Sequence, residues 1–276
     1  MINAYYNGEF SNRTDVRIPL SDRAIFFGDA VYDAAIGRNG GVFMLDEHLH
    51  RFYDNCDSMD IKPYVSSPDL KSLILSIVEQ TDYAENDYFV YFQASRNSAQ
   101  RTHSYSDDAS SNLLITVTPI SILPARKRLK LISYPDIRYE LCDIKTVNLI
   151  PAVLASKYAE CRGADEAVFV KNSNVTECAH SNIQILKGGI LYTHPEDGAI
   201  LPGIAKKHLL SVCDKLKVPY FEKAFTVTEM QSADQVLVTS SSKLCLLAES
   251  FDGTYYDNAK NTLGDTLASA MREDYF

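Results

Sequence analysis

Two stretches in the first third of the chain repeat apolar residues at the spacing of an α-helix. The first has large apolar residues at alternating steps of four and three, at Leu45, Leu49, Phe52, Cys56 and Met59. The second follows Ser67-Pro68, which we interpret as an N-cap and a proline at the first helical position, and its apolar face continues through residues 70–78. Both stretches therefore predict amphipathic helices with one buried face.

Shorter apolar or alternating runs predict β-strands in both halves of the chain. These runs occupy residues 88–94, 113–118, 129–134, 166–170 and 236–239. Asn7-Gly8 and Lys187-Gly188-Gly189 predict hairpin turns, because asparagine and glycine adopt the positive φ angles that tight turns require. The strands of these hairpins are expected within residues 2–10 and 183–193.

Helix signals recur between these strands. Ser21 or Asp22 is expected to cap a short turn that leads into residues 23–32. Further helices are predicted over residues 151–161, 203–216 and 258–272. Thr228 and Gln231 have the spacing of a small capping box.

Mixed strands and helices in both halves predict an α/β (mixed α+β) fold with two domains. Residues 119–128 carry two prolines and a basic cluster, which makes them the best candidate linker. We therefore expect a smaller N-terminal α/β domain over residues 1–120 and a larger C-terminal domain over 121–276. The order of the strands does not follow from the pattern.

Composition excludes several classes of protein. The chain has 276 residues, 46% of them hydrophobic, and a formal net charge of -9, which argues against nucleic acid as a partner. None of its six cysteines forms a C-x-x-C pair, so we expect reduced cysteines and no metal site. No apolar run approaches membrane-spanning length, and the N-terminus lacks signal-peptide features. We expect a cytoplasmic protein without a membrane partner.

The stretch from Cys142 to Asn148 carries the candidate chemistry. It places Lys145 among short apolar residues and next to polar ones that can orient it. A lysine in an apolar setting becomes a usable amine nucleophile, and such an amine forms a Schiff base with an aldehyde cofactor such as pyridoxal phosphate. The alternative is an ordinary solvated surface lysine.

Other residues fit a phosphorylated pyridine. Gly203-Ile204-Ala205 opens a predicted helix, whose N-terminal amides and dipole favour an anion. Ser240-Ser241 ends a strand with two hydroxyl donors, and Arg51 could add a bidentate charge. Glu177 could pair with a pyridinium nitrogen. Each has an ordinary structural alternative. These are a helix start for Gly203-Ile204-Ala205, a strand-terminal turn for Ser240-Ser241, a solvated helix face for Arg51 and a surface position for Glu177.

The ordered set of motifs resembles the class IV, fold type IV, pyridoxal-phosphate aminotransferases. The resemblance runs in collinear order from about Tyr6 to Gly253. It rests on Phe27-Gly28-Asp29-Ala30-Val31-Tyr32, Glu47-His48-Leu49, Arg51-Phe52, Asp143-Ile144-Lys145-Thr146, Val175-Thr176-Glu177, Ser181-Asn182, Leu201-Pro202-Gly203-Ile204 and Val238-Thr239-Ser240-Ser241.

The resemblance implies a role for each matching residue. Lys145 would bind pyridoxal phosphate as a Schiff base and move the substrate Cα proton, while Glu177 would face the pyridine nitrogen. The phosphate would be held by Arg51, Ile204, Ala205, Ser240 and Ser241. The family fold has the cofactor between a smaller N-terminal and a larger C-terminal, cofactor-binding domain. It works as a homodimer whose subunits share active sites.

Arg101-x-His103 is similar to the carboxylate trap of the D-amino acid aminotransferases. The resemblance implies that Arg101 and His103 of one subunit, with Tyr32 of the other, hold the substrate α-carboxylate. We therefore expect ping-pong transamination of D-alanine and 2-oxoglutarate to pyruvate and D-glutamate.

Some residues depart from that pattern and keep other functions open. Cys178-Ala179-His180 stands where a serine-rich run is common, Ala205 replaces a common threonine, and Lys243 follows the serines unexpectedly. We expect Lys243 or His180 to compensate near the cofactor or to reshape the pocket. The alternatives are 4-amino-4-deoxychorismate lyase, which Cys178-Ala179 favours, an (R)-selective amine or branched-chain aminotransferase, and a non-catalytic protein on this fold.

Overall fold

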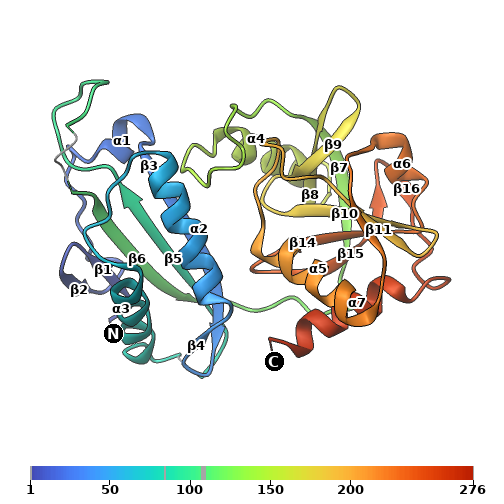
Figure 1. Ribbon diagram of the computed structural model, residues 1–276, viewed down its shortest axis with the longest axis horizontal. Coiled ribbons are helices and arrows are strands. Elements are labelled where there is room, and N and C mark those ends of the chain that lie inside the picture. The colour runs from blue at the N-terminus through green and yellow to red at the C-terminus, as the bar shows by residue number, and fades with distance from the viewer. Residues whose placement is uncertain (1, 84, 107–109, 276) are drawn as a thin grey trace. The chain divides into compact units, whose positions relative to one another are not determined.

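The computed structural model describes residues 2–83, 85–106 and 110–275 of the chain. The chain divides into two compact units (Figure 1). The first comprises Met1–Ile122 with Ile144–Asn148, and the second Leu123–Asp143 with Leu149–Phe276. Both contain sheets and helices, which confirms the α/β fold class. The short Ile144–Asn148 segment, which carries Lys145, belongs to the first unit, although the sequence placed it in the C-terminal domain. The assignment of cofactor binding to residues 121–276 stays a prediction.

The first unit has one sheet with the strand order β2-β1-β6-β5-β3-β4 among its described residues. Its strands are β1 (Ala4–Tyr6), β2 (Glu9–Ser11), β3 (Ala30–Arg38), β4 (Gly41–Val42), β5 (Tyr88–Ser95) and β6 (Asn112–Pro119). Its helices are α1 (Arg23–Phe27), α2 (Leu45–Ser58) and α3 (Ser67–Glu79). The predicted hairpin is confirmed, because β1 and β2 pair antiparallel around Asn7 and Gly8, both at positive φ.

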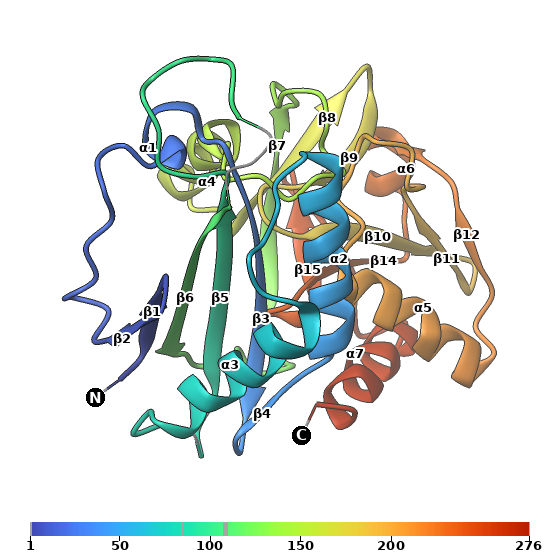
Figure 2. The ribbon, with the colours of Figure 1, turned by 60° about the vertical axis from the view of Figure 1, so that its left-hand side comes forward.

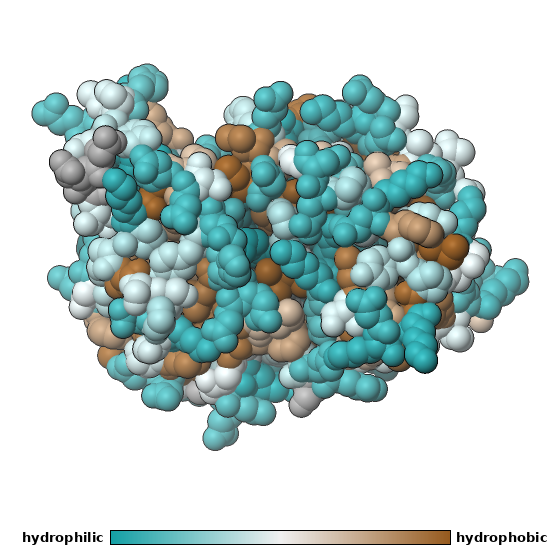
Figure 3. All heavy atoms as spheres, viewed as in Figure 1, coloured by the Kyte–Doolittle hydropathy of each residue, from teal (hydrophilic) through white to brown (hydrophobic). Residues whose placement is uncertain are grey.

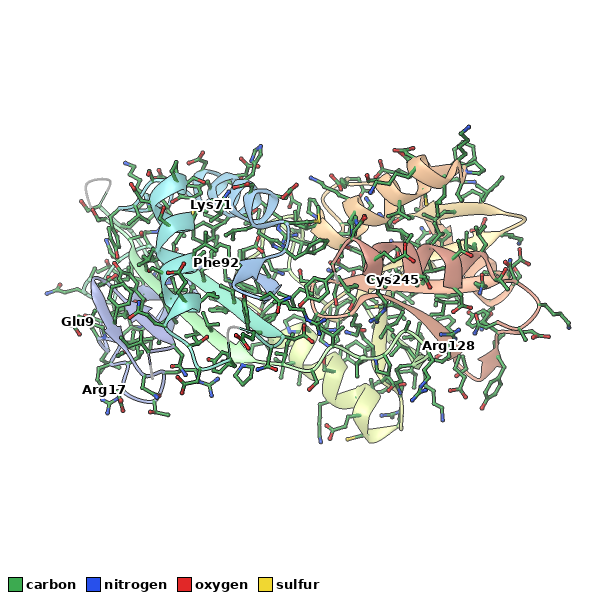
Figure 4. The ribbon with its side chains drawn as sticks, turned by 90° about the horizontal axis from the view of Figure 1, so that it is seen from below. Glu9, Arg17, Lys71, Phe92, Arg128 and Cys245 are labelled. Carbon is green, nitrogen blue, oxygen red and sulfur yellow. The ribbon has the colours of Figure 1, made fainter. Side chains whose placement is uncertain are left out.

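The two predicted amphipathic helices cover this sheet, as Figure 2 shows for α2. Phe52 of α2 is fully buried, with its ring centroid 5.0 Å from that of Phe92 on β5. Figure 4 labels Phe92 among the side chains of this unit. Truncating a buried phenylalanine to alanine typically costs about 3–5 kcal/mol, so this contact is a large part of what holds α2 in place.

One predicted helix start differs in detail from the structure, and another is confirmed. The N-cap of α3 is Ser66, whose hydroxyl accepts from the Asp69 amide, so Ser67 already belongs to the helix. Of the two candidates before α1, Asp22 is the cap: its carboxylate accepts from the Ala24 amide at 2.8 Å. The chain then continues into the long strand β3, which the sequence did not predict.

The second unit has one large sheet with the strand order β12-β11-β10-β14-β15-β7-β8-β9-β13, and β16 pairs with β15, among the described residues. Its strands are β7 (Arg128–Pro135), β8 (Glu166–Lys171), β9 (Asn174–Cys178), β10 (Asn182–Lys187), β11 (Ile190–Thr193), β12 (Tyr220–Glu222), β13 (Phe225–Thr226), β14 (Gln235–Ser240), β15 (Leu244–Phe251) and β16 (Thr254–Tyr255). Its helices are α4 (Ile150–Cys161), α5 (Ile204–Leu216), α6 (Val227–Gln231) and α7 (Leu263–Glu273).

Helices α5 and α7 lie side by side on one face of this sheet (Figures 1 and 2). Their buried residues, including Leu209 and Leu267, pack against Cys245 and Leu247 of β15. Figure 4 labels Cys245 within this unit. Because apolar residues also cover the other face, the central strands are buried on both sides.

Two predictions in this unit were wrong in detail. The capping box of α6 is formed by Thr226 and Glu229, not by Thr228 and Gln231. The last helix begins at Leu263 rather than near Asn258, because the Asn258 side-chain amide instead donates to the Ala248 carbonyl. Across the described part of the chain, every helix is too short or too polar to cross a membrane.

Candidate active site

Lys145 is held against strand β3 of the first unit. The Tyr32 amide donates to the Lys145 carbonyl at 2.9 Å, and the Val147 amide donates to the Ala30 carbonyl at 3.2 Å. Ile144 packs on the core of the unit and anchors the start of the segment. The Lys145 ammonium lies 4.6 Å from the centre of the Tyr32 ring. Two residues predicted for the site are therefore in contact.

Gly28 and Asn148 fix the other end of this segment. The Asn148 side-chain amide donates to the Gly28 carbonyl at 3.1 Å. Gly28 has a φ of +62°, and a Cβ there would collide with the Asn148 amide oxygen. The glycine of Phe27-Gly28-Asp29 is thus required both for its conformation and for the close approach of Asn148.

Arg51 is bound within a buried ionic cluster on α2 and β3. Its Nε and one Nη donate to the two carboxylate oxygens of Asp33, each at 2.8 Å, and Asp33 is fully buried. The His48 ring nitrogen lies 2.7 Å from the same carboxylate. Burial acts to raise the pKa of Asp33, but the charge of Arg51 and the His48 hydrogen bond outweigh it and hold that pKa well below its ordinary value. The sequence pattern assigned no role to Asp33 or to His48, although His48 belongs to the Glu47-His48-Leu49 motif and precedes Arg51 by one helical turn.

Arg101 and His103 are brought together on an exposed loop of the same unit. The Arg101 guanidinium lies 5.4 Å from the centre of the Phe27 ring, and the His103 ring is 5.3 Å from it. Tyr32 instead stacks on Tyr91, with ring centroids 5.2 Å apart. The structure thus places the arginine and the histidine of the predicted trap against the same Phe27 ring, and places Tyr32 in contact with Lys145.

Glu177 in the second unit lies near the end of strand β9 and is buried. Its carboxylate accepts from the Asn182 side-chain amide at 2.9 Å and from the Leu201 amide at 3.2 Å. It also forms an ion pair with Arg138. These donors fix the orientation of the carboxylate.

Arg138 is a further residue of this site that the sequence analysis did not assign. Its Nε and one Nη donate to the two oxygens of Asp136, at 2.9 and 2.7 Å, and the same Nη donates to the Ala199 carbonyl at 2.9 Å. Burial acts to lower its pKa, but the Asp136 hydrogen bonds and the Glu177 carboxylate raise it above the ordinary value. The guanidinium is therefore always charged and keeps Glu177 in place. The only sequence signal was the Asp-x-Arg spacing.

Asn182 connects Glu177 to the start of α5. Its amide donates to the Leu201 carbonyl at 3.0 Å as well as to Glu177, and its oxygen occupies the space where a Cβ on Gly203 would lie. Helix α5 then begins at Ile204 without a side-chain cap. Its first-turn amides are therefore available to an anion.

Ser240 and Ser241 lie at the end of β14, beside the start of β10. The strands pair Asn182 with Thr239, which places the serine turn next to the turn before Asn182. The two serines thus lie near Asn182, whose side chain contacts Gly203 at the start of α5. Amide donors and hydroxyls near an oriented carboxylate have the chemistry to hold a phosphorylated pyridine.

Lys243 and His180, the unexpected residues, both contact Glu166. The Lys243 ammonium lies 3.2 Å from the Glu166 carboxylate and 3.2 Å from the Ser181 hydroxyl, and the His180 ring pairs with the other Glu166 oxygen. Burial acts to raise the pKa of Glu166, but the charges of Lys243 and His180 lower it to about 2. Lys243 therefore ties the serine turn to the turn that follows Glu177.

Comparison with known proteins identifies the family. The family model described as amino-transferase class IV matches residues 30–251. A D-alanine aminotransferase of Staphylococcus epidermidis is 30% identical over 100% of this chain and 97% of its own length. One from Bacillus licheniformis is 32% identical over 97% of this chain and 95% of its own length.

Solved structures share the fold at lower identity. A branched-chain aminotransferase from Thermoproteus uzoniensis has a TM-score of 0.91 at 19% identity, covering 99% of this chain and 94% of that one. A branched-chain amino acid aminotransferase from Thermobaculum terrenum, in its PLP-form, has a TM-score of 0.87 at 19% identity, covering 99% and 94%. A putative 4-amino-4-deoxychorismate lyase from Legionella pneumophila has a TM-score of 0.84 at 22% identity, covering 95% and 97%.

Proposed function

Because this chain belongs to the class IV aminotransferases, we propose that it is a pyridoxal-phosphate enzyme that transaminates D-amino acids. The reaction is the ping-pong conversion of D-alanine and 2-oxoglutarate to pyruvate and D-glutamate. The observation that carries the proposal is similarity over nearly the whole chain to proteins named D-alanine aminotransferase, at 30% and 32% identity. Arg101 and His103, whose side chains both lie against the Phe27 ring, support the same substrate class.

Pyridoxal phosphate, when bound, supplies an aldehyde for the substrate amine and a ring that withdraws electrons from the substrate Cα. Lys145 Nζ would hold the cofactor through its amine and, when free of it, would accept the proton from the substrate Cα and later return one. Glu177, which Asn182 and Arg138 orient, would pair with the ring nitrogen and favour its protonated form.

From the family resemblance, we assign the phosphate of a bound cofactor to five residues. Ile204 and Ala205 would offer first-turn amides, Ser240 and Ser241 would offer hydroxyl donors, and Arg51 would add positive charge. Asp33 supports this role because it holds the Arg51 guanidinium in one orientation. No step of the reaction is assigned to these groups, whose task is binding.

The substrate α-carboxylate is assigned to Arg101, His103 and Tyr32. A guanidinium binds a carboxylate through two parallel hydrogen bonds, and the imidazole adds a further donor. All D-amino acid substrates share this carboxylate. The contacts of the substrate side chain with the enzyme therefore decide which D-amino acid reacts fastest.

We further propose a homodimer in which Arg101 and His103 of one subunit serve the active site of the other. Exposed apolar residues in each unit support an interface. In the first unit they include Leu20, 73% exposed, and Ile25, 50% exposed. In the second they include Ile150 and Val153, 64% and 58% exposed on α4. Exposed apolar groups of this kind are typical of protein interfaces. Figure 3 shows one face of the molecule, which is mostly polar.

We place the enzyme in the cytoplasm. All six cysteines are free, as expected for a protein from a reducing compartment. The substrates are small molecules, and the net charge of -9 makes nucleic acid an unsuitable partner.

The test is a visible absorption scan of the purified enzyme before and after D-alanine, with L-alanine as the control. The proposal predicts a long-wavelength band that bleaches with D-alanine alone and without a keto acid. A band that persists with both alanines would contradict D-alanine as donor. The next assays would then be release of pyruvate from 4-amino-4-deoxychorismate, which Cys178-Ala179 favours, and amino transfer from an (R)-amine or a branched-chain amino acid.

A further inference from the structure

The loop that carries Arg101 and His103 is attached to the residues around α1. The Arg23 amide donates to the Asn97 carbonyl at 3.0 Å, and the Ala99 amide donates to the Ser21 carbonyl at 3.0 Å. Among the described residues, these main-chain hydrogen bonds hold the loop up to residue 99, and further along the Tyr105 hydroxyl donates to the Asp60 carboxylate at 3.2 Å. Arg101 and His103 themselves are exposed, and the loop needs another attachment to give them a defined position.

The side chain of Arg23 supplies this attachment. It is buried, and its two terminal nitrogens donate to the carbonyls of Thr102 at 2.7 Å and His103 at 3.2 Å. Its guanidinium also lies 4.7 Å from the centre of the Phe27 ring. Phe27 is the ring that Arg101 and His103 contact, so one arginine holds both the backbone and the surface on which the two side chains rest.

Arg23 is in turn fixed by Asp29. Its Nε donates to the Asp29 carboxylate at 2.7 Å. Arg96 binds the same carboxylate but directs its other nitrogens to the carbonyls of Met59 and Asp60, both at 2.8 Å. Burial acts to raise the pKa of Asp29, but the hydrogen bonds of Arg96 and Arg23 outweigh it and lower that pKa. The guanidinium of Arg23 is therefore paired and held in a single orientation.

We propose that Arg23 is a positioning residue for substrate binding, which fixes the backbone of Thr102 and His103 so that Arg101 and His103 can bind the substrate α-carboxylate. The inference rests on the proposed function and adds a residue that touches neither substrate nor cofactor. A lysine could keep the ion pair with Asp29 but lacks the planar fork that reaches two carbonyls. Arg23→Lys therefore removes the attachment of the loop with little change of charge.

The experiment is a double-mutant cycle of Arg23→Lys and Arg101→Ala in the holoenzyme, with D-alanine and 2-oxoglutarate. Arg23→Lys alone should lower kcat/KM for D-alanine about 10- to 100-fold, mainly through KM, with unchanged cofactor affinity and visible band. Added to Arg101→Ala it should have no further effect, because the trap is already lost. Arg38→Lys is the matched control: Arg38 forms a two-bond ion pair with Asp87 at the far end of β3.

The outcomes separate this inference from the proposed function. A wild-type enzyme that shows no half-reaction with D-alanine would overturn both. The inference alone would be overturned if the wild type is active but Arg23→Lys is as active as Arg38→Lys. It would also be overturned if the losses of kcat/KM caused by Arg23→Lys and Arg101→Ala multiply in the double variant. If Arg23→Lys does not fold, Phe27→Leu takes its place in the cycle, with the same expected dependence on Arg101.

Discussion

Replacing Asp33 by asparagine tests the buried cluster around Arg51. The change keeps the shape of the side chain but removes its charge. Asp33 is fully buried, accepts two hydrogen bonds of 2.8 Å from Arg51, and is 2.7 Å from the His48 ring nitrogen. Removing one partner of a buried ion pair costs about 3–5 kcal/mol, because the remaining charge is left uncompensated. Since the asparagine amide retains one acceptor, we expect the lower end, about 3 kcal/mol.

The free energy of unfolding is measured by denaturation in urea for the wild type and for Asp33→Asn. The matched control is Asp54→Asn on the same helix. Asp54 pairs with His50 at 2.9 Å, but the two side chains are 62% and 78% exposed, so this change should cost under about 0.5 kcal/mol. A loss below about 1 kcal/mol for Asp33→Asn would refute the reasoning that this pair is desolvated.

The pH dependence provides a second check of the same change. The pKa of Asp33 is depressed in the folded protein, so its contribution to stability is complete above the unfolded value of about 4 and is lost as the pH falls towards the folded value. The difference in stability between wild type and Asp33→Asn should therefore be constant from about pH 5 to 8 and should shrink below about pH 4. A difference that grows on acidification would contradict the assignment.

Three further changes test other parts of the account. Asn182→Ala removes a 2.9 Å hydrogen bond to Glu177 and should weaken cofactor binding about tenfold, measured by titration of the visible band; equal affinity would argue against its orienting role. Lys243→Ala leaves Glu166 without its cation and should also weaken cofactor retention. It should raise the pKa of Glu166 from about 2, so that acid unfolding begins at higher pH, and unchanged retention would exclude the role of Lys243. Val153→Glu places a charge on the exposed apolar face of α4 and should shift sedimentation from dimer to monomer, whereas an intact dimer would place the interface elsewhere.

The spacing of apolar residues and of turn residues along the chain predicted two kinds of element: helices with one buried face, and turns that depend on neighbouring residues. The stripe on α2 is an example, because Leu49, Phe52 and Cys56 are all buried in the core of the first unit. The Asn7-Gly8 hairpin is another, since its turn depends on the two residues themselves.

Strands buried on both faces were harder to predict. Strand β15 carries a continuous apolar run and no alternation, and it lies between β14 and β7 in the sheet. A run of this kind gives no helical or alternating period to recognise. Strand order likewise depends on long-range pairing, as in the parallel contact of β15 with β7.

The candidate site could be predicted residue by residue but not as a set of contacts. Lys145 and Tyr32 were identified separately, and their contact arises from the attachment of the Lys145 segment to β3. Arg138 was missed because its partner Glu177 lies 39 residues away in the sequence. Sequence analysis thus identified reactive groups, whereas the residues that orient them came from the fold.

The most direct test of the central claim is the chirality of the product. Wild-type enzyme with pyridoxal phosphate, D-alanine and 2-oxoglutarate should form pyruvate and D-glutamate in equal amounts, and L-alanine should give neither. Formation of L-glutamate, or pyruvate that appears without any glutamate, would contradict a D-amino acid aminotransferase.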